Sequence, residues 1–223
     1  MQIINDPDLH YNLCQICIES PHSLLSELDR KVKQQITETT ICISYKKGDL
    51  IYQEGRMPIG LLCLVSGKVK IFKEGVGGRQ QIVRMAKPIG FIGYRAFFAE
   101  EMHIASAEAL EDSIVCRIKT DLIFDIVRTN PEFAMSIIRA LATDLGFSNR
   151  RTVTLTQKHI RGRLAEALLV LKDTYGYEAD NATLKVCLTR EDLANLSNMT
   201  TANAIRTLSH FASEGIVELD GKK

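Results

Sequence analysis

Hydrophobic and polar positions change their period several times along the chain. Between residues 38 and 120, short apolar or alternating runs are separated by glycines, and they cover residues 41–45, 61–65, 68–72 and 113–118. Many short strands with glycine turns are typical of a sandwich or barrel-like roll. The pattern therefore predicts a β-roll, with a short helix before it at 20–37 and another after it at 121–128.

A long amphipathic helix is expected next. It begins at Asn130-Pro131, where proline suits the first helical turn, and runs to about residue 158. Steps of four and three residues join Ala134, Ile138, Leu141, Leu145, Ser148, Thr152 and Leu155. This is the coiled-coil spacing, in which a helix packs against a partner helix. Packing on its own domain is the alternative, but the polar second half favours a seam between two chains. A further helix is expected over residues 160–174.

The segment from Leu188 onward predicts two helices joined by a tight turn. Thr189 can cap the first helix, with Asp192 three residues on as its reciprocal partner. Residues 197–199 form the turn, and Thr200 caps the second helix. Such a pair of helices is how many proteins place a helix in the DNA major groove.

The second of these helices has two different faces. Its expected buried stripe is Ile205, Leu208 and Phe211, and its other face carries Thr201, Asn203, Arg206 and His210. Residues 214–216 should end the helix and begin a strand, and Asp220-Gly221 is a hairpin turn signal.

Composition narrows the class of protein. The chain has 223 residues, 45% of them hydrophobic, which is enough for real cores, and no apolar run of about eighteen residues, so we expect no membrane-spanning helix. The polar, acidic N-terminus argues against a signal peptide. Six cysteines at low density indicate reduced thiols in the cytoplasm. The net charge of +1 does not favour nucleic acid by itself, so any DNA contact must come from local placement.

The order of these parts resembles the bacterial regulators typified by the cyclic-AMP receptor protein and the fumarate-nitrate reduction regulator. The motifs that carry the resemblance are KGDLIYQEG at 47–55, LVSGKVK at 64–70, PIGFIG at 88–93, RGRLA at 161–165 and LTREDLA at 188–194. The resemblance covers nearly the whole chain. It implies an α+β fold: a cyclic-nucleotide-binding-like jelly roll over 1–129, a dimerisation helix over 130–158, and a winged helix-turn-helix over 159–223.

The function implied is that of an effector-gated transcription regulator, not an enzyme. It would bind a palindromic operator in double-stranded DNA as a homodimer, with RNA polymerase as a further partner. A small-ligand or cyclic-nucleotide-binding module without direct DNA function is the alternative. A metal-dependent β-roll enzyme would need closely spaced histidines, and His103 is the only histidine between residues 23 and 158.

Six residues are candidates for DNA contact. By resemblance, Thr189 and Arg190 hold the DNA backbone, and Arg206 matches an arginine that reads a base. An arginine can donate two hydrogen bonds to one guanine edge. Ala202 stands where the family usually has glutamate, so the operator should differ from the family's common half-site. The full set is Thr189, Arg190, Thr200, Thr201, Asn203 and Arg206.

The candidate effector pocket departs from the cyclic-nucleotide pattern. Tyr94 replaces the family's glutamate, and His103-Ile104 replace its Arg-Ser pair. A buried phosphate needs a cation and several N–H donors, so we do not expect cyclic-nucleotide binding. Arg95 is the residue that could substitute, and the effector stays unassigned. The pocket residues are Gly93, Tyr94, Arg95, His103 and Ser148.

The cysteines leave open the alternative that the chain binds an iron-sulfur cluster. Cys14 and Cys17 match the start of the cluster-ligand pattern in the family's oxygen-sensing branch. Cys116 stands at the position of that branch's distant cluster ligand. A cluster usually needs four thiolates, and only His22 lies near the missing position. We therefore favour ordinary thiols and no metal over an iron-sulfur cluster, with zinc a smaller alternative. The other cysteines, Cys42, Cys63 and Cys187, lie in apolar runs that indicate core packing.

Overall fold

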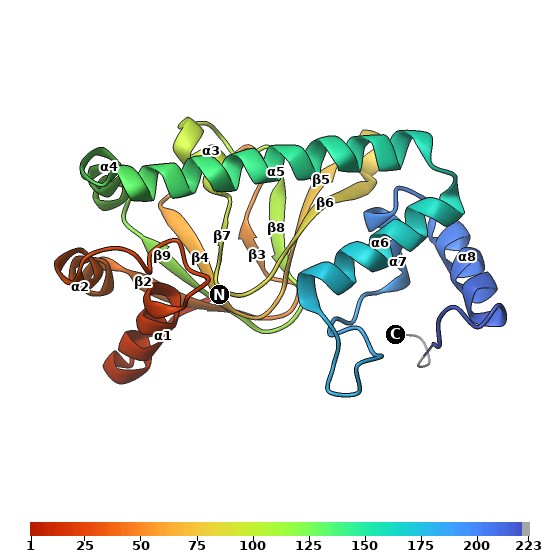
Figure 1. The fold of residues 1–223 in the computed structure, drawn as a ribbon, viewed down its shortest axis with the longest axis horizontal. Helices are drawn as coiled ribbons and strands as arrows, with labels where there is room; N and C mark the ends of the chain where they lie inside the picture. The colour runs from red at the N-terminus through yellow and green to blue at the C-terminus, as the bar shows by residue number, and fades with distance from the viewer. Residues whose placement is uncertain (220–223) are drawn as a thin grey trace. The chain divides into compact units, whose positions relative to one another are not determined.

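The computed structural model describes residues 1–219, which divide into two compact units. The first contains residues Met1–Ile71 and Ala86–Asp144; the second contains Phe72–Met85 and the chain from Leu145 onward. Figure 1 labels the elements of both.

Two β-sheets form the predicted roll. The five-stranded sheet has the order β1 (Gln2–Ile3), β2 (Ile41–Tyr45), β9 (Ser113–Ile118), β4 (Leu61–Ser66) and β7 (Gly90–Ile92), and all its pairs are antiparallel. The other sheet has the order β3 (Leu50–Tyr52), β8 (Ser106–Ala109), β5 (Val69–Glu74) and β6 (Gln80–Ala86), with the short helical turn η1 (Val76–Gly78) between its last two strands.

Alternate residues of the five-stranded sheet face two different cores. Ile43 and Val115 lie in one core with Leu64, while Cys42 and Cys116, their neighbours in sequence, lie in the other. Successive side chains of a strand point to opposite faces, and here both faces are buried. This is why the run at 61–65 is apolar throughout, since a strand buried on both faces needs no polar positions.

Helices bury the second face of that sheet. They are α1 (Pro7–Glu19), α2 (Arg30–Thr39), α3 (Tyr94–Ala99), α4 (Thr120–Thr129) and the first half of α5 (Pro131–Gln157). From the long helix, Phe133 and Ile137 reach this core. The predicted α4 and α5 are confirmed within one or two residues.

The predicted helix over 20–37 is wrong at its N-terminal end. The chain forms α1 first, then turns in which Leu25 and Leu28 are buried, and only then α2. Asp6 caps α1 by accepting hydrogen bonds from the backbone of residues 8 and 9, and Pro7 occupies the first helical position. This Asp-Pro start signal was present in the sequence and was missed.

The second unit holds the C-terminal helices. These are the end of α5, then α6 (Ile160–Tyr175), α7 (Arg190–Leu196) and α8 (Thr201–Ser213). A single bridge pairs Tyr177 with Leu184 in the connection before α7. The strand expected at Ile216 does not form within residues 216–219, and Asp220-Gly221 lies outside the described residues. Over residues 1–219, no helix is long and apolar enough to cross a membrane.

Candidate DNA-binding surface and effector site

Two capped helices and a tight turn form the candidate DNA-binding surface. Thr189 caps α7 by accepting from the Asp192 backbone N–H at 2.9 Å. The Asp192 carboxylate in turn accepts from the Thr189 hydroxyl at 2.7 Å. Asn198 takes the left-handed conformation in the turn, with φ 51°. Thr200 caps α8 through the Asn203 backbone N–H at 3.3 Å. The caps and the turn expected from the sequence are confirmed.

The prediction that Ile205 lies on the buried face of α8 is wrong. The buried positions of α8 are Ala204, Thr207, Leu208 and Phe211, whereas Ile205 is 45% exposed. The small Ala204 occupies the inward position one residue earlier, where the helix passes close to its neighbours. Ile205 therefore joins the outward face beside Arg206, and this apolar member of the surface was missed.

The outward face of α8 combines one cation with small polar groups. Arg206 is exposed and donates a hydrogen bond to the Asn203 side-chain oxygen, one turn away. Thr189, Thr200 and Thr201 are exposed at the helix starts, and Arg190 is half-buried at the start of α7. All six candidate residues thus lie on the two helices or their caps; their contacts with DNA stay predictions.

An arginine of α6 contacts the C-terminal end of α8. The Arg161 guanidinium lies 4.7 Å from the centre of the Phe211 ring and donates to the Glu214 carboxylate at 2.8 Å. That contact raises the pKa of Arg161 and lowers the pKa of Glu214. Both side chains are about half exposed, so solvent screens the ion pair and it contributes little stability by itself.

Of the candidate effector residues in the first unit, Tyr94 and His103 are buried and Gly93 is half-buried. Gly93 has φ 68°, and a Cβ there would come within 2.8 Å of the His103 ring. That ring is 6% exposed and stacks on Tyr52 with centroids 4.0 Å apart. Tyr94 is buried, and its hydroxyl donates to the Asp144 carboxylate.

The other two candidates are exposed. Arg95 is exposed and pairs with Glu101 at 2.9 Å. Ser148 is exposed on α5, in the second unit. Gly93 and His103 thus lie together, Arg95 lies at the surface, and the place of Ser148 in the pocket stays a prediction.

These residues do not fit the phosphate of a cyclic nucleotide. Burial, with a smaller effect of Arg95, lowers the pKa of His103, so this side chain is neutral at pH 7. Arg95 is already paired at the surface, and the buried Lys70 in the roll is paired with Glu108 at 3.1 Å. A buried phosphate would lack the cation that it requires.

Two expectations about the cysteines are corrected. Cys42 and Cys116 form a disulfide instead of being reduced thiols, because antiparallel β2 and β9 place them directly opposite each other, with Cα atoms 4.1 Å apart. Cys187 is exposed in the connection before α7 instead of packing in a core.

The remaining cysteines are buried in the first unit. Burial, and to a smaller extent Cys17, raises the pKa of Cys14 to about 12. A hydrogen bond with Cys63, and then burial, raises the pKa of Cys17. The raised pKa values of Cys14 and Cys17 favour the protonated form of these two thiols. His22 is exposed, and the histidine beside the cysteines is His10, whose Nε2 lies 3.8 Å from the Cys14 sulfur.

The fold and the helix pair are those of a DNA-binding regulator with an N-terminal β-roll. Residues 42–130 match the model of the cyclic nucleotide-binding domain, and residues 162–223 match the Crp-like helix-turn-helix domain. The chain belongs to the CRP/FNR family of DNA-binding transcription regulators, and it is not an enzyme.

Individual relatives show the range of the family. The chain is 26% identical to the CRP-like cAMP-activated global transcriptional regulator of Mycobacterium tuberculosis, over 81% of each chain. It is also 26% identical to the fumarate and nitrate reduction regulatory protein of Vibrio cholerae, over 95% of this chain and 82% of that one. FixK2 of Bradyrhizobium japonicum shares the fold, with a TM-score of 0.74 and 23% identity over 82% of this chain and 89% of that one.

Proposed function

We propose that this regulator binds a palindromic operator as a homodimer and changes its DNA affinity when its β-roll receives a signal. In this proposal residues 1–129 sense, 130–158 dimerise and 159–223 bind DNA. The observation that carries it is the capped α7–turn–α8 unit, whose α8 contains no acidic residue and exposes Arg206. Because its ligand is DNA, we place the protein in the cytoplasm, with RNA polymerase as a further partner.

The long helix supplies the proposed dimer seam. Ile138 and Leu145 on α5 are 55% and 64% exposed, although Phe133 and Ile137 of the same helix are buried. Large apolar side chains seven residues apart on an exposed helix face are suited to a second helix. A two-fold dimer would present two copies of α8 to two half-sites, spaced by about one turn of DNA.

The exposed face of α8 suggests how bases are read. Arg206 would donate to a guanine edge, and its hydrogen bond to Asn203 holds the guanidinium on the outward face. Ile205 beside it offers an apolar contact for a thymine methyl group. Thr189, Arg190, Thr200 and Thr201 lie at helix N-termini, where phosphate oxygens are bound.

A selection experiment tests the proposed function. Purified protein is incubated with a random DNA pool, and the bound fraction is sequenced. We expect an inverted repeat containing a guanine in each half-site. Recovery of DNA without any shared motif would contradict sequence-specific binding.

We further propose that the effector is not a cyclic nucleotide, because the β-roll offers no unpaired buried cation for its phosphate among the residues named above. Titration calorimetry with cyclic AMP and cyclic GMP should give no measurable heat of binding. Micromolar affinity, abolished in Arg95→Ala, would contradict this and identify Arg95 as the phosphate ligand.

A further inference from the structure

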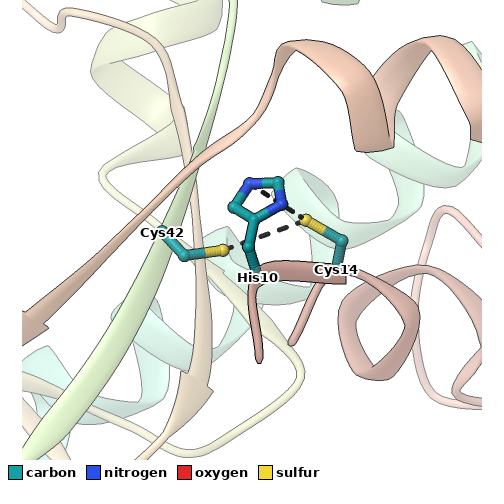
Figure 2. A group of neighbouring side chains, drawn as sticks. All are labelled: His10, Cys14 and Cys42. Carbon is teal, nitrogen blue, oxygen red and sulfur yellow. Dashed lines mark hydrogen bonds between the residues drawn. The ribbon is translucent and has the colours of Figure 1, made fainter. Parts of the chain in front are cut away.

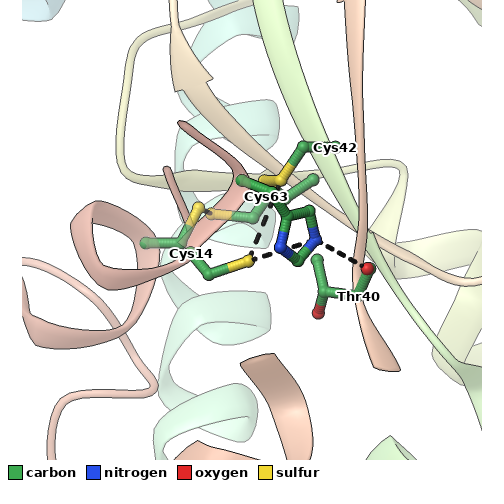
Figure 3. The surroundings of a disulfide bond; sticks show 7 residues. Cys14, Thr40, Cys42 and Cys63 are labelled. Carbon is green, nitrogen blue, oxygen red and sulfur yellow. Dashed lines mark hydrogen bonds between the residues drawn. A yellow bond between two sulfur atoms is a disulfide. The ribbon is translucent and has the colours of Figure 1, made fainter. Parts of the chain in front are cut away.

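Five of the six cysteines converge on one face of the five-stranded sheet. Cys63, Cys116 and Cys42 occupy matched positions on the neighbouring strands β4, β9 and β2. Cys14 and Cys17 lie three residues apart on α1, which contacts all three strands. Figure 3 shows the disulfide with Cys14, Cys63 and Thr40 around it. The proposed function uses none of these side chains.

One histidine joins the group at a spacing that suits a single metal ion. The Cys14 sulfur lies 3.8 Å from His10 Nε2 and 3.9 Å from the Cys42 sulfur, and all three atoms lie within 4.8 Å of one another (Figure 2). Two sulfurs on one tetrahedral Zn²⁺ are about 3.8 Å apart, and a sulfur and a nitrogen about 3.6 Å, from the usual bond lengths. The ligand atoms are thus already close to the separations that one ion imposes.

A buried hydroxyl provides a second, independent observation. Thr40 is 6% exposed, and its Oγ1 has no hydrogen-bond partner in the part of the chain that the structure describes. Thr40 lines the same small cavity as Cys14 and Cys116, and its carbonyl accepts from His10 Nε2 at 2.9 Å. Buried hydroxyls nearly always have a partner, so the unsatisfied Thr40 hydroxyl marks this corner of the core as polar, beside the proposed ligands but not one of them.

We propose that the reduced chain binds one Zn²⁺ ion through His10 Nε2 and the thiolates of Cys14, Cys42 and Cys116, and that the Cys42–Cys116 disulfide abolishes this site. Cys116 is the fourth ligand because it is bonded to Cys42 and lines the cavity beside Cys14. Three thiolates and one imidazole form a common closed zinc site. On binding, the imidazole proton moves from Nε2 to Nδ1 and the hydrogen bond from Nε2 to the Thr40 carbonyl is broken, which leaves the Nε2 lone pair free to bind the metal.

Reduction of the disulfide supplies two of the thiol ligands. A phosphine reductant and one water convert the disulfide to two thiols and the phosphine oxide, a two-electron step. Zn²⁺ then displaces the thiol protons of Cys14, Cys42 and Cys116, which leave to solvent.

The arrangement favours a single ion over a multi-iron cluster. The Cys17 sulfur lies 2.8 Å from the Cys63 sulfur on β4, so Cys17 is engaged by Cys63, although it lines the same cavity as Cys14 and Cys116. A cluster that used Cys14, Cys17 and Cys116 would have to break this contact. The single-ion site leaves it in place.

The site would link two parts of the sensor domain. His10 and Cys14 belong to α1, whereas Cys42 and Cys116 belong to β2 and β9. The core that contains these cysteines also contains Phe133 and Ile137 of α5. Oxidation of Cys42 and Cys116 to the disulfide by a peroxide, which takes up the two electrons and is reduced to water, would release the ion and therefore alter the packing under the long helix. This regulatory use rests on the proposed function, whereas zinc binding does not.

Metal titration of the full chain tests the site. Protein reduced with a phosphine and desalted without oxygen is titrated with Co²⁺, then with Zn²⁺, and bound zinc is measured by mass spectrometry. We expect intense tetrahedral cobalt absorption that Zn²⁺ abolishes, with one zinc per chain. Oxidised protein should bind at least tenfold less. No binding by reduced protein would overturn the proposal.

Variants identify the ligands. Cys42→Ser and His10→Gln should each weaken zinc binding at least tenfold; His10 is only half-buried, so its variant avoids a change inside the core. The matched control is Cys187→Ser, which removes an exposed thiol and should bind zinc normally. Normal binding by both ligand variants would contradict the assignment. A brown iron-sulfur chromophore that depends on Cys17 would also contradict the assignment. DNA is absent from these assays, so failure of the proposed function would leave their outcome unchanged.

Discussion

The guanidinium of Arg151, near the end of α5, donates a hydrogen bond to the backbone carbonyl of Leu196, the last residue of α7. A second, longer bond of 3.5 Å reaches the carbonyl of Ile82. Arg151 is 7% exposed, and burial lowers its pKa. Its Nε and Nη1 have no hydrogen-bond partner within residues 1–219. A buried cation thus connects the long helix to the first helix of the DNA-binding pair.

Replacing Arg151 should show whether its charge or its hydrogen-bond geometry determines its effect on stability. Removing a poorly paired buried charge while keeping its volume is often neutral or stabilising. We therefore expect Arg151→Met to be more stable than Arg151→Lys, which keeps the charge but cannot reach both carbonyls. Urea unfolding measures both variants. The opposite order would mean that charge alone, not the two-carbonyl geometry, stabilises this position.

The hydrogen bond from Tyr94 to Asp144 joins α3 to α5 within the first unit. Because the acceptor is a carboxylate, Tyr94→Phe should lower the free energy of unfolding by about 1.5–3 kcal/mol. Tyr11→Phe is the matched control, since Tyr11 is 56% exposed and should change stability by less than about 0.5 kcal/mol. Equal effects of the two changes would refute a structural role for this contact.

His103 should make stability depend on pH. Its pKa is lowered in the folded state, so between about pH 6.5 and that lower pKa the unfolded chain binds more protons than the folded chain. The contribution of neutral His103 to the free energy of unfolding is complete above about pH 6.5 and is lost as the pH falls. His103→Phe keeps a ring on Tyr52 and should lose less stability between pH 7.5 and 5.5 than the unaltered chain. Identical losses in denaturant titrations would rule this origin out.

The dimer seam is best tested at Leu145. Leu141, on the same predicted stripe, packs partly against the chain's own core, so changing it would also disturb folding. Leu145→Glu places a charge at a two-fold seam opposite its own copy, and we expect monomers by light scattering. The control is Thr143→Glu. Thr143 is exposed and lies on the opposite side of the heptad from Leu145, so this variant should remain dimeric. A dimeric Leu145→Glu protein would show that the chains associate elsewhere.

Much of the fold was predictable because its signals are local. Pro131 marks the start of α5, and Thr189 and Thr200 mark the starts of the DNA-binding helices. The cap at Asp6 was equally local but was overlooked. Ile205 was misplaced because helical spacing alone does not say whether a small residue beside a large one takes the inward position.

The cysteine site was not predictable in the same way. The Cys42–Cys116 pair spans 74 residues, and only strand register brings the two together. His10 lies one helical turn before Cys14, which matters only once α1 is known to exist. The resemblance directed attention to Cys17 and His22, whereas the structure places Cys42 and His10 beside Cys14.

The central claim is that α8 reads the operator through Arg206 while α7 holds the backbone through Arg190. The most direct measurement is DNA selection, followed by salt-dependent affinity, for Arg206→Ala and Arg190→Ala in parallel. Arg206→Ala should lose the preference for guanine at one position of each half-site and cost about 1–3 kcal/mol per contact. Arg190→Ala should select the same motif, bind all sequences more weakly, and lower the salt dependence by about one charge per subunit. An unchanged motif for Arg206→Ala together with an altered motif for Arg190→Ala would contradict this account.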